Sequence, residues 1–296
     1  SSGDALSYVV SVSTSQGTGW LSVTSASGTT PASFTVNVSP AGLAPGNYNG
    51  TVSVASTGAS GSPRNVSVSF TVVAVTAPSL TVFVNAANFL PSAAVPGMIV
   101  TLGGVGIGPT ALTTLQLKPN GTVETKLAYT RILFDGIESP LVYVSSTQYS
   151  CVVPYGVAGR LSTRVQVEYK GVLSNALDLR VADAFPGIFT ANSAGSGQGS
   201  ILNQNGSVNS TSNQADRGSV IVIYATGEGQ TTPAGADGTV AGATLKRPLL
   251  RVAAKIGGQD ALVEYAGSAP GLISGAFQVN LRVPGTVIPG PAVPVE

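Results

Sequence analysis

One glycine-rich run and two Asp-Gly pairs are the first candidates for ligand-binding residues in this sequence. The run Gly103–Gly108 resembles loops that cradle phosphate, but neither a lysine nor a helical pattern follows it. A bulged turn at the end of a sheet is the favoured interpretation. Asp135-Gly136 and Asp237-Gly238 look like fragments of calcium loops. Because the alternating ladder of acidic residues is absent, hairpin turns are favoured there as well.

Histidine is absent from the chain, and Cys151 is its only cysteine. Ser-His-Asp and Cys-His catalysis, histidine general bases and histidine or thiolate metal sites are therefore excluded. The 13 acidic residues are spread over the chain, so no nucleophile and base can be grouped from the sequence. Cys151 stands in an apolar run typical of a buried strand. We expect no catalytic residue, no metal site, no cofactor and no enzymatic activity.

Aromatic residues offer a different chemistry, because sugars stack on exposed rings. Trp20, the only tryptophan, and Tyr48 are the candidate carbohydrate-binding residues. At the end of a strand in a small sandwich a tryptophan is more often a core residue, so both interpretations are kept. Asn-x-Ser/Thr sequons, which arise freely in this composition, occur at Asn37, Asn49, Asn65, Asn120, Asn205 and Asn209.

The composition limits the class of protein. Hydrophobic residues make up 43% of the 296 residues and charged residues 9%, which excludes a disordered chain. No apolar run reaches the roughly 18 residues that a membrane span needs. A net charge of +1 gives no attraction to nucleic acid or anionic lipid. A surface of Ser, Thr, Asn, Gln and Gly suits an extracellular, secreted protein.

Alternating apolar and polar residues predict the elements that position these groups. Val and Phe alternate with Ser, Thr and Asn in Tyr8–Ser13, Phe34–Ser39, Thr51–Val54 and Val66–Val72. This period of two is typical of half-buried antiparallel strands, and turn-rich segments separate them. No window carries a helical stripe. We expect an all-β chain of tandem immunoglobulin-like β-sandwiches in a rod, the first at residues 1–76.

The first segment resembles the BACON family. The residues that carry the resemblance are Trp20–Val23, Ser27–Ala32, Leu43–Thr51 and Val66–Val72. The resemblance implies an immunoglobulin-like sandwich appended to secreted bacterial proteins and proposed to bind carbohydrate or mucin. Members of that family have one or two strands ahead of the position of Tyr8, so we expect the opening strand to be missing here.

Landmarks in the rest of the chain occur twice in the same order. Gly97, Gly106 and Gly108 are spaced as Gly218, Gly227 and Gly229, and Gln148 precedes Pro154 as Gln278 precedes Pro284. The period is about 120–130 residues, the size of a domain. The sequence therefore predicts two related sandwiches, at residues 81–183 and 184–296.

These two segments resemble the uncharacterised C-terminal domain family of large secreted acidobacterial, Solibacter-type proteins. The matching residues are Asn85–Phe89, Pro96–Pro109, Phe134–Gly136, Leu141–Pro154, Pro186–Thr190, Tyr224–Gly229, Ile256–Gly258, Tyr265–Gly271 and Phe277–Asn280. Their glycine-rich opening also looks like TIG-type immunoglobulin-like domains. The family has no established activity. Its members continue past the position of Glu296, so we expect the closing strand to be missing.

Two functions follow as hypotheses. The first is a non-enzymatic structural or adhesive protein of a bacterial surface, self-associating into a head-to-tail filament by strand sharing. Its predicted assembly residues are Tyr8, Val10, Val12, Val283, Val287, Val293 and Val295. The alternative is an array of carbohydrate-binding modules with glycans as partners. The polar stretch 192–217 is expected to be a surface loop or an adaptable contact, and a fragment of a longer chain would also explain the missing strands.

Overall fold

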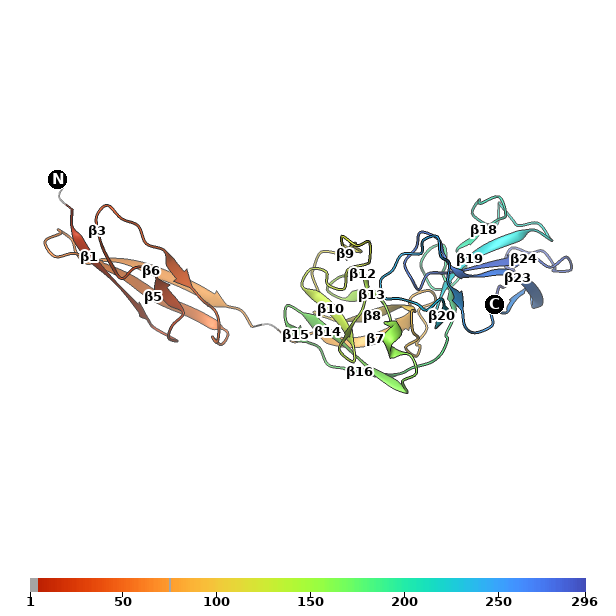
Figure 1. Cartoon of the computed structure of the whole chain (residues 1–296), viewed down its shortest axis with the longest axis horizontal. Helices are drawn as coiled ribbons and strands as arrows, with labels where there is room; N and C mark the ends of the chain where they lie inside the picture. The colour runs from red at the N-terminus through yellow and green to blue at the C-terminus, as the bar shows by residue number, and fades with distance from the viewer. Residues whose placement is uncertain (1–4, 75) are drawn as a thin grey trace. The chain divides into compact units, whose positions relative to one another are not determined.

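The computed structural model describes residues 5–74 and 76–296 (Figure 1) and divides into two compact units, residues 1–76 and 77–296. Among the described residues the regular structure is β, apart from one 3₁₀ turn at Tyr155–Val157. The expected all-β fold class is thus confirmed, whereas the rod stays a prediction. No helix in the described part is long and apolar enough to cross a membrane.

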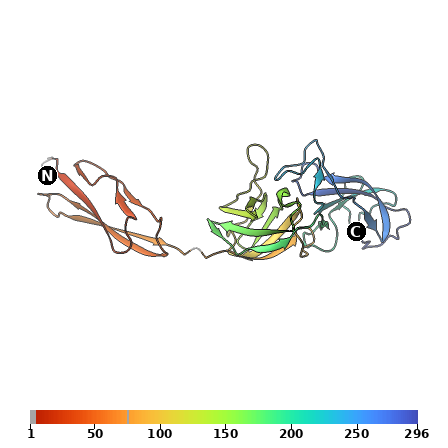
Figure 2. The same ribbon diagram turned by 60° about the horizontal axis from the view of Figure 1, so that its bottom comes forward.

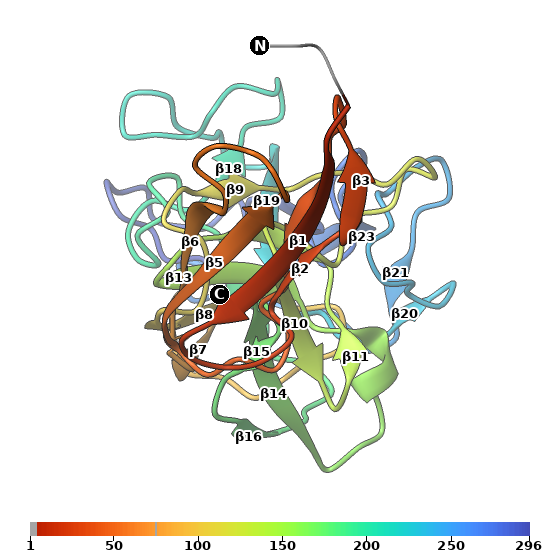
Figure 3. The ribbon, with the colours of Figure 1, turned by 90° about the vertical axis from the view of Figure 1, so that its left-hand side faces the viewer.

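The first unit is built from two antiparallel sheets. Its four-stranded sheet has the order β3-β1-β5-β6 (Figure 3). Strand β2 pairs with β4 in the second sheet. The strands are β1 (Ser7–Thr14), β2 (Leu21–Val23), β3 (Ser27–Thr29), β4 (Val36–Val38), β5 (Gly46–Ala55) and β6 (Arg64–Val72). Alternate residues of these strands face a common core of Tyr8, Val10, Trp20, Leu21, Tyr48 and Val52.

Trp20 and Tyr48 lie in this core. Trp20 is only 2% exposed, and its indole Nε1 donates a hydrogen bond to the carbonyl of Gln16 at 2.9 Å. The Tyr48 hydroxyl donates to the carbonyl of Ala44 at 2.7 Å, and the Phe70 ring packs 5.7 Å from that of Trp20. Both polar tips are satisfied inside the unit, as buried aromatic residues require. The core interpretation therefore fits both residues, and they do not form an exposed platform for a sugar.

Strand β1 is not the open edge that strand sharing would need. Its first residues pair with β3 on one side, and the strand pairs with β5 along the other. Tyr8 and Val10 are buried in the core of the unit, and only Val12 of the three predicted assembly residues is exposed. Tyr8 and Val10 cannot contact a partner while this unit is folded, so the prediction for them is wrong.

Residues 79–180 form a closed sandwich of two five-stranded sheets. One has the order β7-β8-β13-β12-β9; the other has β11-β10-β14-β15, with β16 also paired to β14. The first sheet comprises β7 (Ser79–Asn85), β8 (Ile99–Val105), β9 (Thr113–Thr114), β12 (Leu141–Val144) and β13 (Gln148–Val152). The second comprises β10 (Thr130–Phe134), β11 (Ile137–Glu138), β14 (Ser162–Tyr169), β15 (Val172–Leu173) and β16 (Leu177–Arg180). Both sheets contribute to one large apolar core.

Residues 187–282 form separate sheets (Figure 2). The main sheet has the order β17-β19-β24-β23-β22, with β18 also paired to β19, and β20 pairs with β21. The strands are β17 (Gly187–Ile188), β18 (Ile201–Leu202), β19 (Val220–Thr226), β20 (Thr231–Thr232), β21 (Arg247–Pro248), β22 (Ala254–Ile256), β23 (Gln259–Ser268) and β24 (Phe277–Arg282). This part of the chain therefore has one main sheet where residues 79–180 have two.

The main sheets of the two segments share strand order and irregularities. The order β8-β13-β12 recurs as β19-β24-β23. A register shift between Leu141 and Tyr143 in β12 recurs between Val263 and Tyr265 in β23. Bulges are specific features of a fold rather than accidents. The recurrence supports the predicted duplication, while the boundary at 183/184 stays a prediction.

The two segments are joined within the second unit by hydrogen bonds and apolar contacts. The amide of Ile99 donates to Thr226 Oγ1 at 2.8 Å, and the amide of Val123 donates to the carbonyl of Gly238 at 2.8 Å. Ile99 and Val152 also pack against Ala269 and Ala276. The segments therefore form one compact body.

A substitution of Trp20 tests the core of the first unit. Trp20→Ala should destabilise this unit by about 3–5 kcal/mol, the usual cost of removing a large buried aromatic side chain. Limited proteolysis should then cut within residues 1–76 and leave residues 77–296 intact. The control is Val9→Ala at an exposed position of β1. Unchanged resistance of Trp20→Ala to protease would contradict the core position.

Candidate functional site

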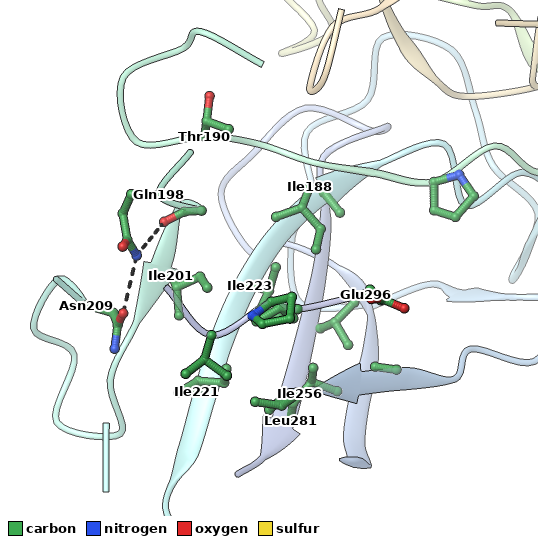
Figure 4. A pocket seen from close by; sticks show the side chains of 18 of the residues that line it. Ile188, Thr190, Gln198, Ile201, Asn209, Ile221, Ile223, Ile256, Leu281 and Glu296 are labelled. Atoms are coloured by element: carbon green, nitrogen blue, oxygen red, sulfur yellow. Dashed lines mark hydrogen bonds between the residues drawn. The ribbon is translucent and has the colours of Figure 1, made fainter. Parts of the chain in front are cut away.

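The main sheet of residues 184–296 borders a cavity of about 1090 Å³. Alternate residues of β19 and β24 form its floor, among them Ile221, Ile223 and Leu281 (Figure 4). Ile188 and Ile256 add further branched aliphatic surface from β17 and β22. The floor is apolar because these side chains belong to the inner face of a sheet.

The cover of this inner face differs between the two segments. In residues 79–180 the second sheet, with β10, β14 and β16, completes the sandwich. In residues 184–296 the cover consists of β22 and of loops within 186–217 and 287–296. Loops follow a flat sheet less closely than a packed sheet does, which leaves the space open.

Amide and hydroxyl side chains line the mouth of the cavity. Gln198 Nε2 donates to Asn209 Oδ1 at 3.2 Å and to the carbonyl of Gly199 at 3.3 Å (Figure 4). Asn209 Nδ2 in turn donates to Asn203 Oδ1 at 2.8 Å. Thr190, Ser210, Thr211 and Gln214 also line the cavity. The polar stretch 192–217, expected to be a surface loop or an adaptable contact, thus supplies hydrogen-bonding groups beside an apolar floor.

The four C-terminal valines predicted as assembly residues all line this cavity. Val283 and Val287 are buried in the core of the segment, and Val293 and Val295 pack against that core. Residues 294–296 pair with β22, so the edge of β22 is covered by the chain itself. Val283 and Val287 are only 7% and 5% exposed, so they do not lie at an exposed strand edge, and a partner could reach them only through the cavity.

Glu228 is a buried acid that sequence reasoning did not single out. It is 8% exposed, lines the cavity, and its Oε2 has no hydrogen-bond partner among the described residues. Burial raises the pKa of this carboxyl from an ordinary 4.5 to about 8, although the backbone N–H groups of Gly227 and Glu228 act in the opposite direction. The carboxyl is therefore mainly protonated at pH 7. The available signal was an acid between two glycines next to a buried strand.

The groups beside Glu228 do not form a catalytic set. Burial raises the pKa of the Tyr155 hydroxyl, and the nearby carboxylates of Glu228 and Asp237 raise it further. Asp237 is held by a hydrogen bond from the Tyr155 amide at 2.8 Å. Lining residues in the described part include two glutamates and two arginines, but no Asp, Lys, Cys or Tyr. No group of three His, Cys, Asp or Glu residues that could hold a metal occurs in the described residues.

The glycine-rich and Asp-Gly stretches are structural. A Cβ at Gly104 would collide with the carbonyl of Ser79, and one at Gly108 with the carbonyl of Ser145. Glycine is thus needed for the close approach of backbones at the end of β8. Asp135 and Gly136 both have positive φ and connect β10 to β11, as expected for a hairpin turn.

Comparisons with known proteins identify part of the second unit. The model of the IPT/TIG domain matches residues 87–181. This segment is TIG-like. The resemblance to TIG-type domains is thus confirmed for the closed sandwich, while those to the BACON and Solibacter-type families stay predictions.

One solved structure is also similar at a distance. It is described as the Bacteroides ovatus mixed-linkage glucan utilization locus SGBP-B in complex with a mixed-linkage heptasaccharide. The sequence identity is 14%, the match covers 94% of this chain and 51% of that one, and the TM-score is 0.27. The chain thus spans about half the length of that protein. The search of curated proteins gave no match.

The raised pKa of Glu228 predicts how the free energy of unfolding depends on pH. Between pH 4.5 and about 8 the folded protein holds a proton that the unfolded chain has lost, so the free energy of unfolding falls as pH rises. Glu228→Gln removes this proton uptake. Its melting temperature should exceed that of the wild type by about 2–4 °C or more at pH 8, and by less at pH 4.5.

Thermal unfolding across this pH range measures the effect. The control is Asp260→Asn, at a side chain that is 93% exposed and lies 3.8 Å from Lys255 Nζ, an exposed pair whose loss should change stability little. A difference between Glu228→Gln and the wild type that does not vary with pH would contradict a buried, protonated carboxyl.

Proposed function

We propose that the chain is a non-catalytic binding protein of the bacterial cell exterior, with a structural or adhesive role, which receives its partner in the cavity of residues 184–296. The observation that carries the proposal is the pairing of an aliphatic floor with an amide and hydroxyl rim in one opening. A partner with apolar groups on one face and hydrogen-bonding groups along its edge would match both surfaces.

The size of the cavity is sufficient for a ligand. Sites for small molecules usually measure about 300–1,000 Å³, and this cavity reaches about 1090 Å³. Two sets of side chains far apart in the sequence, in the loops 186–217 and 287–296, border it. A partner that fills it would contact both loops.

The low charge supports contacts outside the cell. With 9% charged residues and a net charge of +1, binding would depend on apolar burial and neutral hydrogen bonds. Such contacts respond little to salt, because screening acts on charges. A filament needs contacts between copies of the chain. Tyr8 and Val10 are buried in the first unit, so the proposal places such contacts only in residues 184–296.

The accessibility of the cavity can be measured with a fluorescent apolar dye, 8-anilinonaphthalene-1-sulfonate. The wild-type chain should enhance its fluorescence. Ala254 of β22 lines the cavity, so Ala254→Phe should place a ring in that space. This variant should reduce the fluorescence enhancement several-fold and leave the circular dichroism spectrum unchanged. The control is Leu262→Phe, at a position of β23 that is 62% exposed. Equal fluorescence from both variants, or none from the wild type, would overturn the binding role of the cavity.

Glycan binding is the second candidate function, and one observation in the TIG-like segment favours it. Tyr129 is 73% exposed, although it stands in a two-residue hairpin turn with φ values of 44° at Ala128 and 61° at Tyr129. Left-handed backbone costs about 1–2 kcal/mol at a residue with a side chain. An exposed aromatic ring at such a position indicates a role in contact, and sugars stack on rings of this kind.

A substitution that should stabilise the turn tests this role. Tyr129→Gly removes the backbone strain and the ring together, so it should raise the melting temperature and abolish binding on a polysaccharide array. Tyr129→Phe keeps the ring and should retain binding. Glycan binding that is equal in wild type and Tyr129→Gly would exclude Tyr129 as the platform.

A further inference from the structure

We infer that the turn at Tyr129 recognises an acidic sugar, whose ring stacks on Tyr129 while its carboxylate or sulfate group binds Lys170. The inference rests on glycan binding, the second candidate function, and names the substrate class of that site. It does not involve the cavity of residues 184–296.

Two hairpin turns lie side by side at one end of the sheet that contains β10 and β14. One turn holds Tyr129 just ahead of β10, and the other holds Lys170 between β14 and β15. Thr130 lies opposite Tyr169 in the β10–β14 ladder, and the Lys170 amide donates to the carbonyl of Tyr129 at 2.9 Å. Tyr129 and Lys170 are therefore adjacent across the two strands.

Both turns hold side chains in backbone conformations that favour glycine. The described part of the chain has six non-glycine residues with positive φ, and three of them lie here: Ala128 at 44°, Tyr129 at 61° and Lys170 at 51°. Asn, Asp and Gly are the usual residues of such turns. Left-handed backbone costs about 1–2 kcal/mol at a residue with a side chain, and strain of this kind gathers at functional sites. The two turns together therefore indicate a role for the side chains of Tyr129 and Lys170.

The positive charge of Lys170 is available to an outside anion. Glu168 and Glu138 both bind Arg131, at 2.7 and 2.9 Å. Lys170 itself forms no ion pair with another described residue. Its ammonium lies 5.1 Å from the centroid of the Tyr169 ring, a cation–π contact that positions the charge and leaves its N–H groups able to donate.

An acidic sugar has both features that these side chains recognise. The C–H groups on the face of a sugar ring stack on an exposed aromatic ring, and Tyr129 is 73% exposed. A carboxylate or sulfate on the same sugar accepts charge-assisted hydrogen bonds from a lysine, which are roughly twice as strong as neutral ones. A neutral sugar would leave Lys170 unused, and a small inorganic anion would leave Tyr129 unused.

Binding to four immobilised polysaccharides tests the class of sugar. Polygalacturonate carries carboxylates and dextran sulfate carries sulfates, while methyl-esterified polygalacturonate and dextran are their neutral counterparts. The whole chain should bind one of the acidic polymers at least about tenfold more tightly than its neutral counterpart. The difference should shrink at high salt, because salt screens the charges. The acidic polymer that binds shows whether the recognised group is a carboxylate or a sulfate.

Variants of Lys170 test the residue. Lys170→Gln removes the charge and should lower the affinity for the acidic polymer about tenfold, whereas Lys170→Arg should retain binding. Lys170→Gly removes the charge and the backbone strain together, so it should weaken binding and raise the melting temperature. The control is Lys255→Gln, which removes the same charge from β22 at a side chain that is 52% exposed and should bind as the wild type does.

The outcomes separate this inference from the proposed functions. Equal binding to acidic and neutral polymers, equal losses in Lys170→Gln and Lys255→Gln, or no binding to any of the four polymers would overturn the inference. Binding to neutral glycans that Tyr129→Gly abolishes would still leave Tyr129 as a sugar platform. Dye binding in the cavity of residues 184–296 does not depend on any of these results.

Discussion

The inner face of a β-sheet must be removed from water, and the second unit does this in two ways. In the TIG-like segment a second sheet covers the inner face and encloses a core with Leu102, Phe134 and Tyr149 at no exposure. In residues 184–296 the same sheet order is present, but loops and the segment 292–296 provide the cover. The cavity lies between the main sheet of residues 184–296 and this cover.

Alternating residues made the strands and their faces predictable from the sequence. The pattern at Val66–Val72 lies within β6, and the pattern at Thr51–Val54 lies within β5. Glycine landmarks predicted turns because only glycine adopts positive φ without strain, as at Gly97 and Gly218. Local rules of this kind depend on neighbours in the sequence, so the sequence itself carries them.

Long-range packing was not predictable in the same way. Trp20 and Tyr48 were candidates for a sugar platform, yet hydrogen bonds to the nearby carbonyls of Gln16 and Ala44 let both polar tips be buried. The period of two shows which face of β1 is apolar, but it does not show that β3 and β5 pair with its edges. Glu228 escaped notice because its burial depends on how the two segments of the second unit join. Which strand edges are paired is decided when the sheets assemble, so the local sequence does not show it.

The central claim is that the apolar floor of residues 184–296 is accessible to an outside molecule. Methyl NMR of the isoleucines tests it most directly, because Ile221 and Ile223 line the cavity whereas Ile132 lies in the closed core of the TIG-like segment. The account predicts that 8-anilinonaphthalene-1-sulfonate shifts the methyl signals of Ile221 and Ile223 and leaves that of Ile132 unchanged. Signals of Ile221 and Ile223 that do not shift, or a shift of Ile132 that is as large, would contradict it.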